Sequence, residues 1–253
     1  MMSNVVITAG GGGLGRVIAE IFLSKGHNVH ICDLDADAVA QTLGDNPGLH
    51  GTVADVGNRD QLHNVFEEAR EWMGHIDVLV NNIGIAGPRA FVEEMPEDEW
   101  QKTIDTNLNS SFWGMKEVLP EMKKRKHGVI INVTTASAKT FPAKRSVYNM
   151  TKYALEGLTL SVAKEAGPFN IRCNAVRPGM MNNERMHGVL RKVAADLGLS
   201  EDEVLQQELK YSSMRTMIEM KEVADMVYFL ASDAAPHITG QIIAVDGNAE
   251  YET

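Results

Sequence analysis

The stretch that decides the fold is VVITAGGGGLG at residues 5–15. Residues 5–8 are all β-branched, as is typical of a buried strand, and glycines at positions 10–13 and 15 follow almost at once. Apolar residues at helical spacing then run from Leu14 to about Lys25. Because glycine has no Cβ, its backbone can turn tightly and approach a phosphate at the positive N-terminus of a helix. The stretch therefore predicts a strand, a phosphate-binding turn and a helix.

The same alternation of strand and helix continues along the chain. Further strands are expected at residues 29–32, 50–53, 78–80, 129–133, 171–176 and 242–245. Helices are expected at residues 36–43 and around Phe66, Met115, Leu158 and Met226. Continuous apolar strands separated by helices are typical of a parallel sheet covered on both faces. The prediction is one α/β domain over residues 1–253, a doubly wound (Rossmann-type) sheet of about seven parallel strands. Residues 182–216 break the alternation, and we expect them to form a helical lid over the substrate.

Asp33 ends the second expected strand, 18 residues after Gly15. A carboxylate at this place can accept both ribose hydroxyls of NAD, and it repels the 2′-phosphate of NADP. The glycine turn holds no cation for such a phosphate, since Arg16 already belongs to the helix. Asp33 can alternatively cap the next helix, a role that Asp35 can also fill. The order of strand, glycines, helix and acid favours nucleotide binding, with NAD as the cofactor.

Composition narrows the possible partners and the location. The net charge of −10 repels phosphate backbones and anionic lipids, so we expect neither nucleic acid nor a membrane as a partner. Cys32 and Cys173 fall in expected strands, which indicates buried free thiols in a reducing compartment. The chain begins without a signal-peptide pattern and has no apolar run of membrane-spanning length, so the expected location is the cytoplasm. The eight histidines show no metal-ligand spacing, and no metal is expected.

Several motifs, in order and spacing, resemble the short-chain dehydrogenase/reductase family, particularly its 3-oxoacyl-carrier-protein-reductase-like branch. The opening Thr-Gly-x-x-x-Gly-x-Gly of that family is similar to residues 8–15, with Ala9 in place of the first glycine. Residues 55–56 resemble its adenine-binding pair, residues 81–84 its Asn-Asn-Ala-Gly, and residues 178–179 the turn beside the nicotinamide. The likeness covers nearly the whole chain. It implies a cofactor site made of Gly10, Gly12, Gly13, Leu14, Asp33, Leu34, Asp55, Val56, Asn82, Ile83, Gly84, Tyr148, Lys152, Pro178, Gly179 and Met181.

Tyr148 and Lys152 are expected to carry the proton chemistry. Residues four apart share one face of a helix, so the phenol and the ammonium point into the same site. A free tyrosine ionises near about pH 10, and a neighbouring ammonium favours the phenolate that a general base needs. The resemblance implies that Lys152 also binds the nicotinamide ribose. The expected function is hydride transfer between NAD(H) and a secondary alcohol or ketone. The alternatives are an NAD(H)-binding redox-sensing regulator without catalysis and a structural oligomerisation module.

The resemblance assigns two further catalytic positions. The family has a serine that binds the substrate oxygen, and Thr135 stands at that distance, 13 residues before Tyr148. Ser137 is the alternative if the loop at residues 139–146 is arranged differently. Asn107 matches the helix asparagine that anchors a water in the family's proton relay. The resemblance also implies a homotetramer, paired through helices at residues 107–126 and 148–166.

Arg177, just before the turn at residues 178–179, has two possible roles. A guanidinium matches a carboxylate or phosphate with two parallel hydrogen bonds, so Arg177, with Arg145, is a candidate site for an anionic group of the substrate. Alternatively, Arg177 pairs with a local carboxylate such as Glu184 or Glu222 and has a structural role. Fold and cofactor motifs do not encode the substrate itself.

Overall fold

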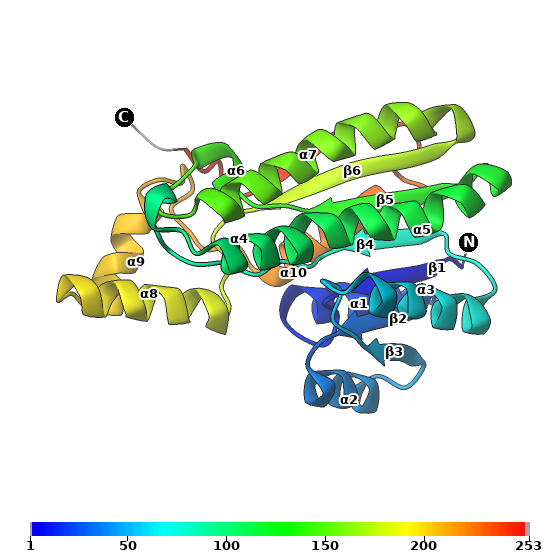
Figure 1. Cartoon of the computed structure of the whole chain (residues 1–253), viewed down its shortest axis with the longest axis horizontal. Coiled ribbons are helices and arrows are strands. Elements are labelled where there is room, and N and C mark those ends of the chain that lie inside the picture. Colours follow the sequence, from blue (N-terminus) through cyan, green and yellow to red (C-terminus); the bar gives the residue numbers. More distant parts are fainter. Residues whose placement is uncertain (1, 251–253) are drawn as a thin grey trace.

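The β-branched runs form strands that lie side by side in one sheet. The computed structural model describes residues 2–250, and its strands are β1 Asn4–Thr8, β2 Asn28–Asp33, β3 Leu49–Val53, β4 Val78–Asn81, β5 Gly128–Val133, β6 Ile171–Pro178 and β7 Ile242–Val245. All neighbouring strands are parallel, in the order β3-β2-β1-β4-β5-β6-β7 (Figure 1). This confirms the predicted doubly wound α/β fold and all seven predicted strands.

Helices cover both faces of the sheet, because successive side chains of a buried strand point to opposite sides. On β1, Val5 and Ile7 belong to one apolar cluster and Val6 to the other. The first face is covered by α1 Gly13–Ser24, α2 Ala36–Asp45 and α10 Met220–Ala231. The second face is covered by α3 Arg59–Met73, α5 Ser110–Arg125 and α7 Ser146–Ala166.

Both cysteines are free and buried, Cys32 in β2 and Cys173 in β6. Burial raises the pKa of each thiol to about 12.

The direction of winding reverses between β1 and β4. The chain runs outward through β2 and β3 and then returns to place β4 on the other side of β1. In such sheets, ligands bind beyond the carboxyl ends of the strands at this switch point. The predicted site residues are expected to meet at this edge.

Two helices of the predicted insertion, α8 Glu184–Leu197 and α9 Glu201–Leu209, project beyond the same edge (Figure 1). They have a small core of their own, formed by Leu190, Ala194 and Val204. The two ends of the insertion are hydrogen-bonded to each other, because Asn182 N donates to Ile218 O and Ile218 N to Met180 O, each at 2.8 Å. The helices are therefore a packed pair that leaves the sheet at this neck, and residues 211–214 of the insertion also bond to residues 247–250, which follow β7.

Several short elements lack a periodic pattern and were not expected. They are the 3₁₀ turns Val92–Glu94 and Gly167–Phe169, the helices α4 Glu97–Ile104 and α6 Ser137–Thr140, and the π-helical turn Asp105–Asn109. Most lie at the carboxyl edge of the sheet or lead toward it. Within residues 2–250, every helix is too short or too polar to cross a bilayer.

Candidate active site

The glycine turn after β1 is tightly packed. Ala9 adopts a left-handed conformation with φ +51°, in the place where the family has a glycine. A Cβ at Gly15 would lie 2.0 Å from the Ala9 carbonyl oxygen, so only glycine fits there. Gly10 packs against Ile31, because a Cβ on it would come within 2.7 Å of that side chain. The turn therefore keeps its close packing with alanine at position 9, at the cost of a strained backbone.

Asp33 points toward the glycine turn. Its Oδ2 accepts a hydrogen bond from Gly11 N at 3.1 Å, and its Oδ1 accepts one from Asp35 N at 3.2 Å. The cap of α2 is Asp35, which accepts from Asp37 N at 3.0 Å and Ala38 N at 3.1 Å. The capping role that was the alternative for Asp33 thus belongs to Asp35, and the Asp33 carboxylate stays beside the turn.

A cavity of about 740 Å³ lies beside this carboxylate. Its wall contains four of the predicted cofactor residues besides Asp33, namely Leu34, Asp55, Val56 and Ile83. Five aspartates line the cavity against a single lysine, Lys102, among the described residues. Arg16, the cation nearest in sequence to the glycine turn, forms ion pairs with Glu20 at 2.7 Å and with Asp45 at 2.9 Å. The cavity is therefore strongly acidic.

A second cavity, of about 950 Å³, shares Ala9, Asp33, Asp35 and Ile83 with the first and continues toward α7 and α8. Most of the remaining predicted site residues line it: Gly12, Gly13, Leu14, Asn82, Gly84, Thr135, Tyr148, Lys152, Pro178, Gly179 and Met181. Gly10 and Asn107 line neither cavity. The structure thus brings the predicted nucleotide and proton-transfer residues to one continuous space at the carboxyl edge of the sheet.

Lys152 is buried at the bottom of the second cavity. Its ammonium donates to Ile83 O at 2.8 Å and to Val133 O at 3.0 Å. Burial, together with the nearby Arg185 guanidinium, lowers the pKa of Lys152 to about 7. Arg185, from α8, donates to Gly84 O at 3.0 Å. The two carbonyls use two of the three N–H bonds of the ammonium, and the third remains for a ligand.

Tyr148 lies on the same wall, with the Arg145 guanidinium 4.3 Å from the centre of its ring. Thr135 and Ser137 both line the cavity near it. The Thr135 hydroxyl oxygen accepts a hydrogen bond from Ser137 N at 3.3 Å. A hydroxyl that accepts from the backbone still has its own proton to donate, so Thr135 can donate to an oxygen in the cavity.

Asn107 connects the loop after β4 to α7. It is fully buried on the π-helical turn, where its Oδ1 accepts from Ile85 N at 2.8 Å. Its Nδ2 donates to Ile85 O at 3.0 Å and to the Thr151 hydroxyl at 3.3 Å. π-helical turns inside helices are often found at functional sites. The side chain of Asn107 therefore holds the loop beside Lys152 in place.

The predicted partners of Arg177 are wrong. Arg177 forms two hydrogen bonds with Glu156 of α7, at 2.9 and 2.7 Å. Glu184 instead contacts Arg191, and Glu222 accepts from the backbone at the start of α10. The Arg177 side chain does not line either cavity. An acidic residue one turn beyond Lys152 on a helix facing the core was the available signal for this pair.

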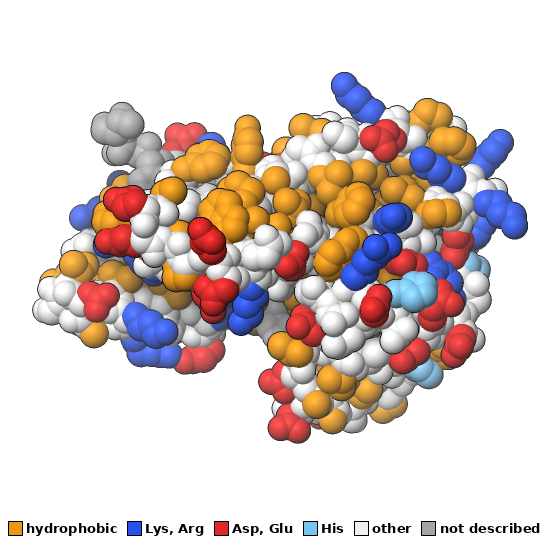
Figure 2. All heavy atoms as spheres, in the orientation of Figure 1, with side chains coloured by type: hydrophobic (Ala, Val, Ile, Leu, Met, Phe, Trp, Pro, Cys, Tyr) orange, Lys and Arg blue, Asp and Glu red, His pale blue; other side chains and the backbone are white. Residues whose placement is uncertain are grey.

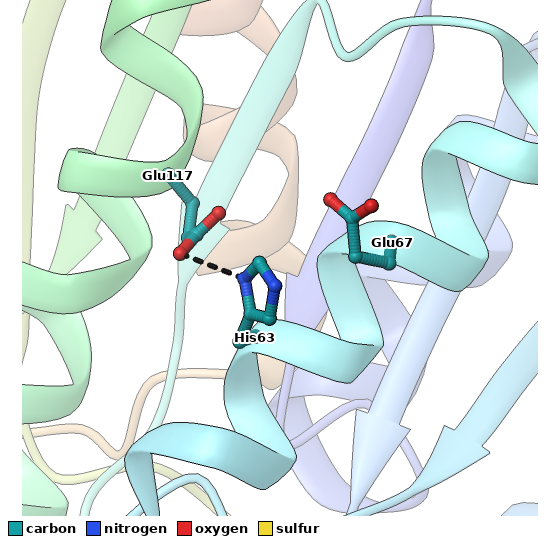
Figure 3. Close-up of side chains that lie close together, drawn as sticks. All are labelled: His63, Glu67 and Glu117. Atoms are coloured by element: carbon teal, nitrogen blue, oxygen red, sulfur yellow. Dashed lines mark hydrogen bonds and ion pairs between the residues drawn. The ribbon is translucent and has the colours of Figure 1, made fainter.

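One cluster of potential metal ligands lies between α3 and α5. His63, Glu67 and Glu117 bring ligand atoms within 4.8 Å of one another (Figure 3). His63 Nδ1 is 3.1 Å from Glu117 Oε1. Arg70 already places a guanidinium 2.7 Å from Glu67 and 3.5 Å from Glu117. Arg70 therefore offsets one of the two carboxylate charges, and none of the three residues lines either cavity.

Comparison with known proteins places this geometry in a family. A family model described as enoyl-(acyl carrier protein) reductase matches residues 9–248. The trans-4-hydroxycyclohexanecarboxylate dehydrogenase of Sinomonas cyclohexanicum is 33% identical over 252 residues, with 96% of this chain and 90% of that protein covered.

Two solved structures have the same fold. The actinorhodin polyketide ketoreductase with NADPH superposes with a TM-score of 0.92 at 25% identity, covering 97% of this chain and 96% of that one. The 3-oxoacyl-acyl-carrier-protein reductase of Brucella melitensis with bound NAD gives 0.85 at 30% identity, covering 99% and 92%. The protein is an oxidoreductase that transfers hydride between a nicotinamide cofactor and an alcohol or ketone, and a regulator without catalysis is not supported. The chain belongs to the short-chain dehydrogenase/reductase family, in its 3-oxoacyl-carrier-protein-reductase-like branch.

Proposed function

We propose that the enzyme uses NAD(H) rather than NADP(H), to interconvert a secondary alcohol and a ketone. The observation that carries the choice of cofactor is the position of Asp33. Gly11 N holds its carboxylate beside the glycine turn, and Asp35, not Asp33, caps α2. The five aspartates around the cavity add to the repulsion of a 2′-phosphate. Arg16, occupied by two carboxylates, does not supply a counter-charge.

Each polar residue around the second cavity has its own role in the proton transfer. NAD(H), when bound, accepts or supplies the hydride. Tyr148 takes the proton from the alcohol, or returns it to the ketone oxygen, as general base or acid. Thr135 donates a hydrogen bond to that same oxygen, and Lys152 directs its remaining N–H toward the ribose and favours the phenolate. Asn107 keeps the loop beside the lysine in position for the water of the proton relay.

Three comparisons test this proposal. We expect kcat/KM to be higher with NAD than with NADP on an alcohol panel, and the opposite preference would remove Asp33 as the ribose acceptor. Tyr148→Phe is expected to lower turnover by about 10²–10⁴-fold, with NADH binding nearly unchanged by fluorescence titration. Activity within a few-fold of the wild type would remove Tyr148 from the mechanism.

Thr135→Ala is expected to lower kcat more than Ser137→Ala does. The reverse ranking would mean that the Ser137 hydroxyl, not that of Thr135, binds the substrate oxygen.

The anionic group expected on the substrate is better placed beside Arg145 than beside Arg177. Arg177 is neutralised by Glu156, whereas Arg145 and Arg89 both line the second cavity, and Arg145 lies next to the catalytic ring. A relative named for a hydroxycyclohexanecarboxylate also supports a substrate with a hydroxyl and a carboxylate. Arg145→Met should raise KM for a hydroxycarboxylate much more than for its methyl ester, and Arg145→Lys should restore part of it. Equal changes for acid and ester would refute this subsite.

The homotetramer and the cytoplasmic location are also proposals. Phe112 of α5 and Tyr153 and Leu160 of α7 are 46%, 57% and 42% exposed, on two helices that pack side by side. Figure 2 shows hydrophobic side chains gathered along the middle of one face. Large exposed apolar patches mark protein interfaces. Sedimentation should give a tetramer that Leu160→Glu dissociates, and a monomer of the wild type at micromolar concentration would contradict this. Two buried free thiols fit the reducing cytoplasm.

A further inference from the structure

A buried carboxylate joins the three elements that carry the active site. Glu156 of α7 is 2% exposed, and its two oxygens accept from Arg177 Nε at 2.9 Å and Nη2 at 2.7 Å. Thr134, which follows β5, donates its hydroxyl to Glu156 Oε1 at 3.0 Å. Arg177 belongs to β6. The ends of β5 and β6 are thus bonded to the catalytic helix at a single side chain.

Two members of this network are chain neighbours of the cavity wall. Thr134 precedes Thr135, and Arg177 precedes Pro178. The two strand ends are also bonded through the backbone, because Thr134 N donates to Val176 O at 2.8 Å. Any shift of the carboxylate therefore reaches the Thr135 hydroxyl through one peptide unit.

The third arm of the network leads to the catalytic lysine. Glu156 lies four residues, about one helical turn, beyond Lys152. The Lys152 ammonium donates to Val133 O at 3.0 Å, so α7 is bonded to the end of β5 at two successive turns. Two attachments on one helix determine its rotation as well as its distance from the strand.

We propose that Glu156 and Arg177 are positioning residues, which set the Thr135 hydroxyl against the Tyr148 phenol. The inference rests on the proposed function of Thr135. A guanidinium and a carboxylate joined by two parallel hydrogen bonds have one planar geometry, and this geometry defines both distance and direction. An apolar pair of similar size would fill the same space and bury no charge, but it would not define the direction.

A double-mutant cycle between Glu156→Gln and Thr135→Ala tests the inference. Glu156→Gln keeps the size of the side chain and removes its charge. In the wild-type background it should lower kcat by about ten- to a hundredfold, as expected when a reacting group is displaced, and leave the Kd for NADH within twofold. In the Thr135→Ala background the same change should lower kcat less than about twofold, because the hydroxyl that it positions is already gone.

A second variant and a matched control separate positioning from loss of stability. Thr134→Val removes the hydroxyl links to Glu156 and to Val176 O and leaves the ion pair, so it should show the same non-additivity on a smaller scale, with rescue by Thr134→Ser. Asp77, 5% exposed, forms the matched control pair with Arg125 at the start of β4, the opposite edge of the sheet. Asp77→Asn should lower the Tm and leave kcat within twofold in both backgrounds.

The outcomes are distinct. Equal fold losses in kcat from Glu156→Gln in both backgrounds, with Thr135→Ala itself impaired, would overturn the positioning role alone. A Thr135→Ala enzyme with unchanged kcat would overturn the proposed function of Thr135, and the positioning role with it. If Glu156→Gln does not fold, Thr134→Val decides by the same comparison.

Discussion

Burial of the Lys152 ammonium should be measurable as a pH dependence of stability in the cofactor-free protein. Burial and the neighbouring Arg185 lower the pKa of Lys152 from the ordinary 10.5 to about 7. Between these two pH values the unfolded chain holds a proton that the folded protein has released. Stability therefore rises with pH through this window, and it is lowest below pH 7, where the ammonium is charged in both states.

The size of the effect follows from the pKa difference. At about 1.4 kcal/mol per pKa unit, the difference is worth about 5 kcal/mol in the free energy of unfolding at most. An entropy of unfolding near 2 cal/mol/K per residue converts this to a shift in Tm of about 10 °C for a chain of this length. The hydrogen bonds to Ile83 O and Val133 O favour the charged form and act against burial, so the measured effect should be at or below this value.

The assay compares urea unfolding of the wild type and of Lys152→Met from pH 6 to pH 10.5. The difference between the two free energies cancels pH-independent changes in packing and hydrogen bonding, as well as other groups that titrate in both proteins. It should shift in favour of the wild type above pH 7, with a slope approaching about 1.4 kcal/mol per pH unit. Lys164→Met, which changes an exposed lysine of the same helix, should give a flat difference. A flat difference for Lys152→Met as well would refute the buried, depressed ammonium.

Three further substitutions test features of the same site. Ala9→Gly should raise the Tm by about 2 °C, because it relieves about 1–2 kcal/mol of left-handed strain against a smaller loss of chain entropy; an unchanged or lower Tm would argue against the strain. Arg177→Met should cost about 3–5 kcal/mol in urea unfolding, because it leaves the buried Glu156 carboxylate without its partner; a loss below about 1 kcal/mol would exclude this explanation. Asp33→Asn should reduce the NAD-over-NADP ratio of kcat/KM by about tenfold or more, since it removes one full charge beside the ribose site; an unchanged ratio would assign cofactor choice to other residues.

The part of the site that the sequence predicted well is the part governed by local patterns. Strand β1, the glycine turn and Asp33 follow one another along the chain, and their geometry depends on neighbours a few residues away. Tyr148 and Lys152 share a helix, so their common direction follows from helical periodicity alone. For these residues the sequence pattern was sufficient.

The part that it missed depends on contacts between distant segments. Arg177 and Glu156 are 21 positions apart. The place of Glu156 one turn beyond Lys152 indicates that it faces the core, but no spacing along the chain pairs it with Arg177. The π-helical turn around Asn107 has no periodic signature, because its geometry is set by bonds to the loop at Ile85. The left-handed conformation of Ala9 also comes from packing, since the turn around Gly15 leaves no other path for the backbone.

The neck of the insertion has a consequence for how this enzyme can diversify. Its two ends are already joined by the bonds between Ile218 and residues 180–182, and its helices have a core of their own. Residues 211–214 also bond to residues 247–250 after β7, so the part of the insertion that can change most freely is the pair of helices α8 and α9. Met186, Val189 and Glu208 of these helices line the second cavity, and substitutions there can change its wall while Tyr148 and Thr135 keep their positions. A lineage with this architecture can acquire new substrates by altering this helix pair, because the elements attached to a rigid sheet tolerate change better than the sheet itself.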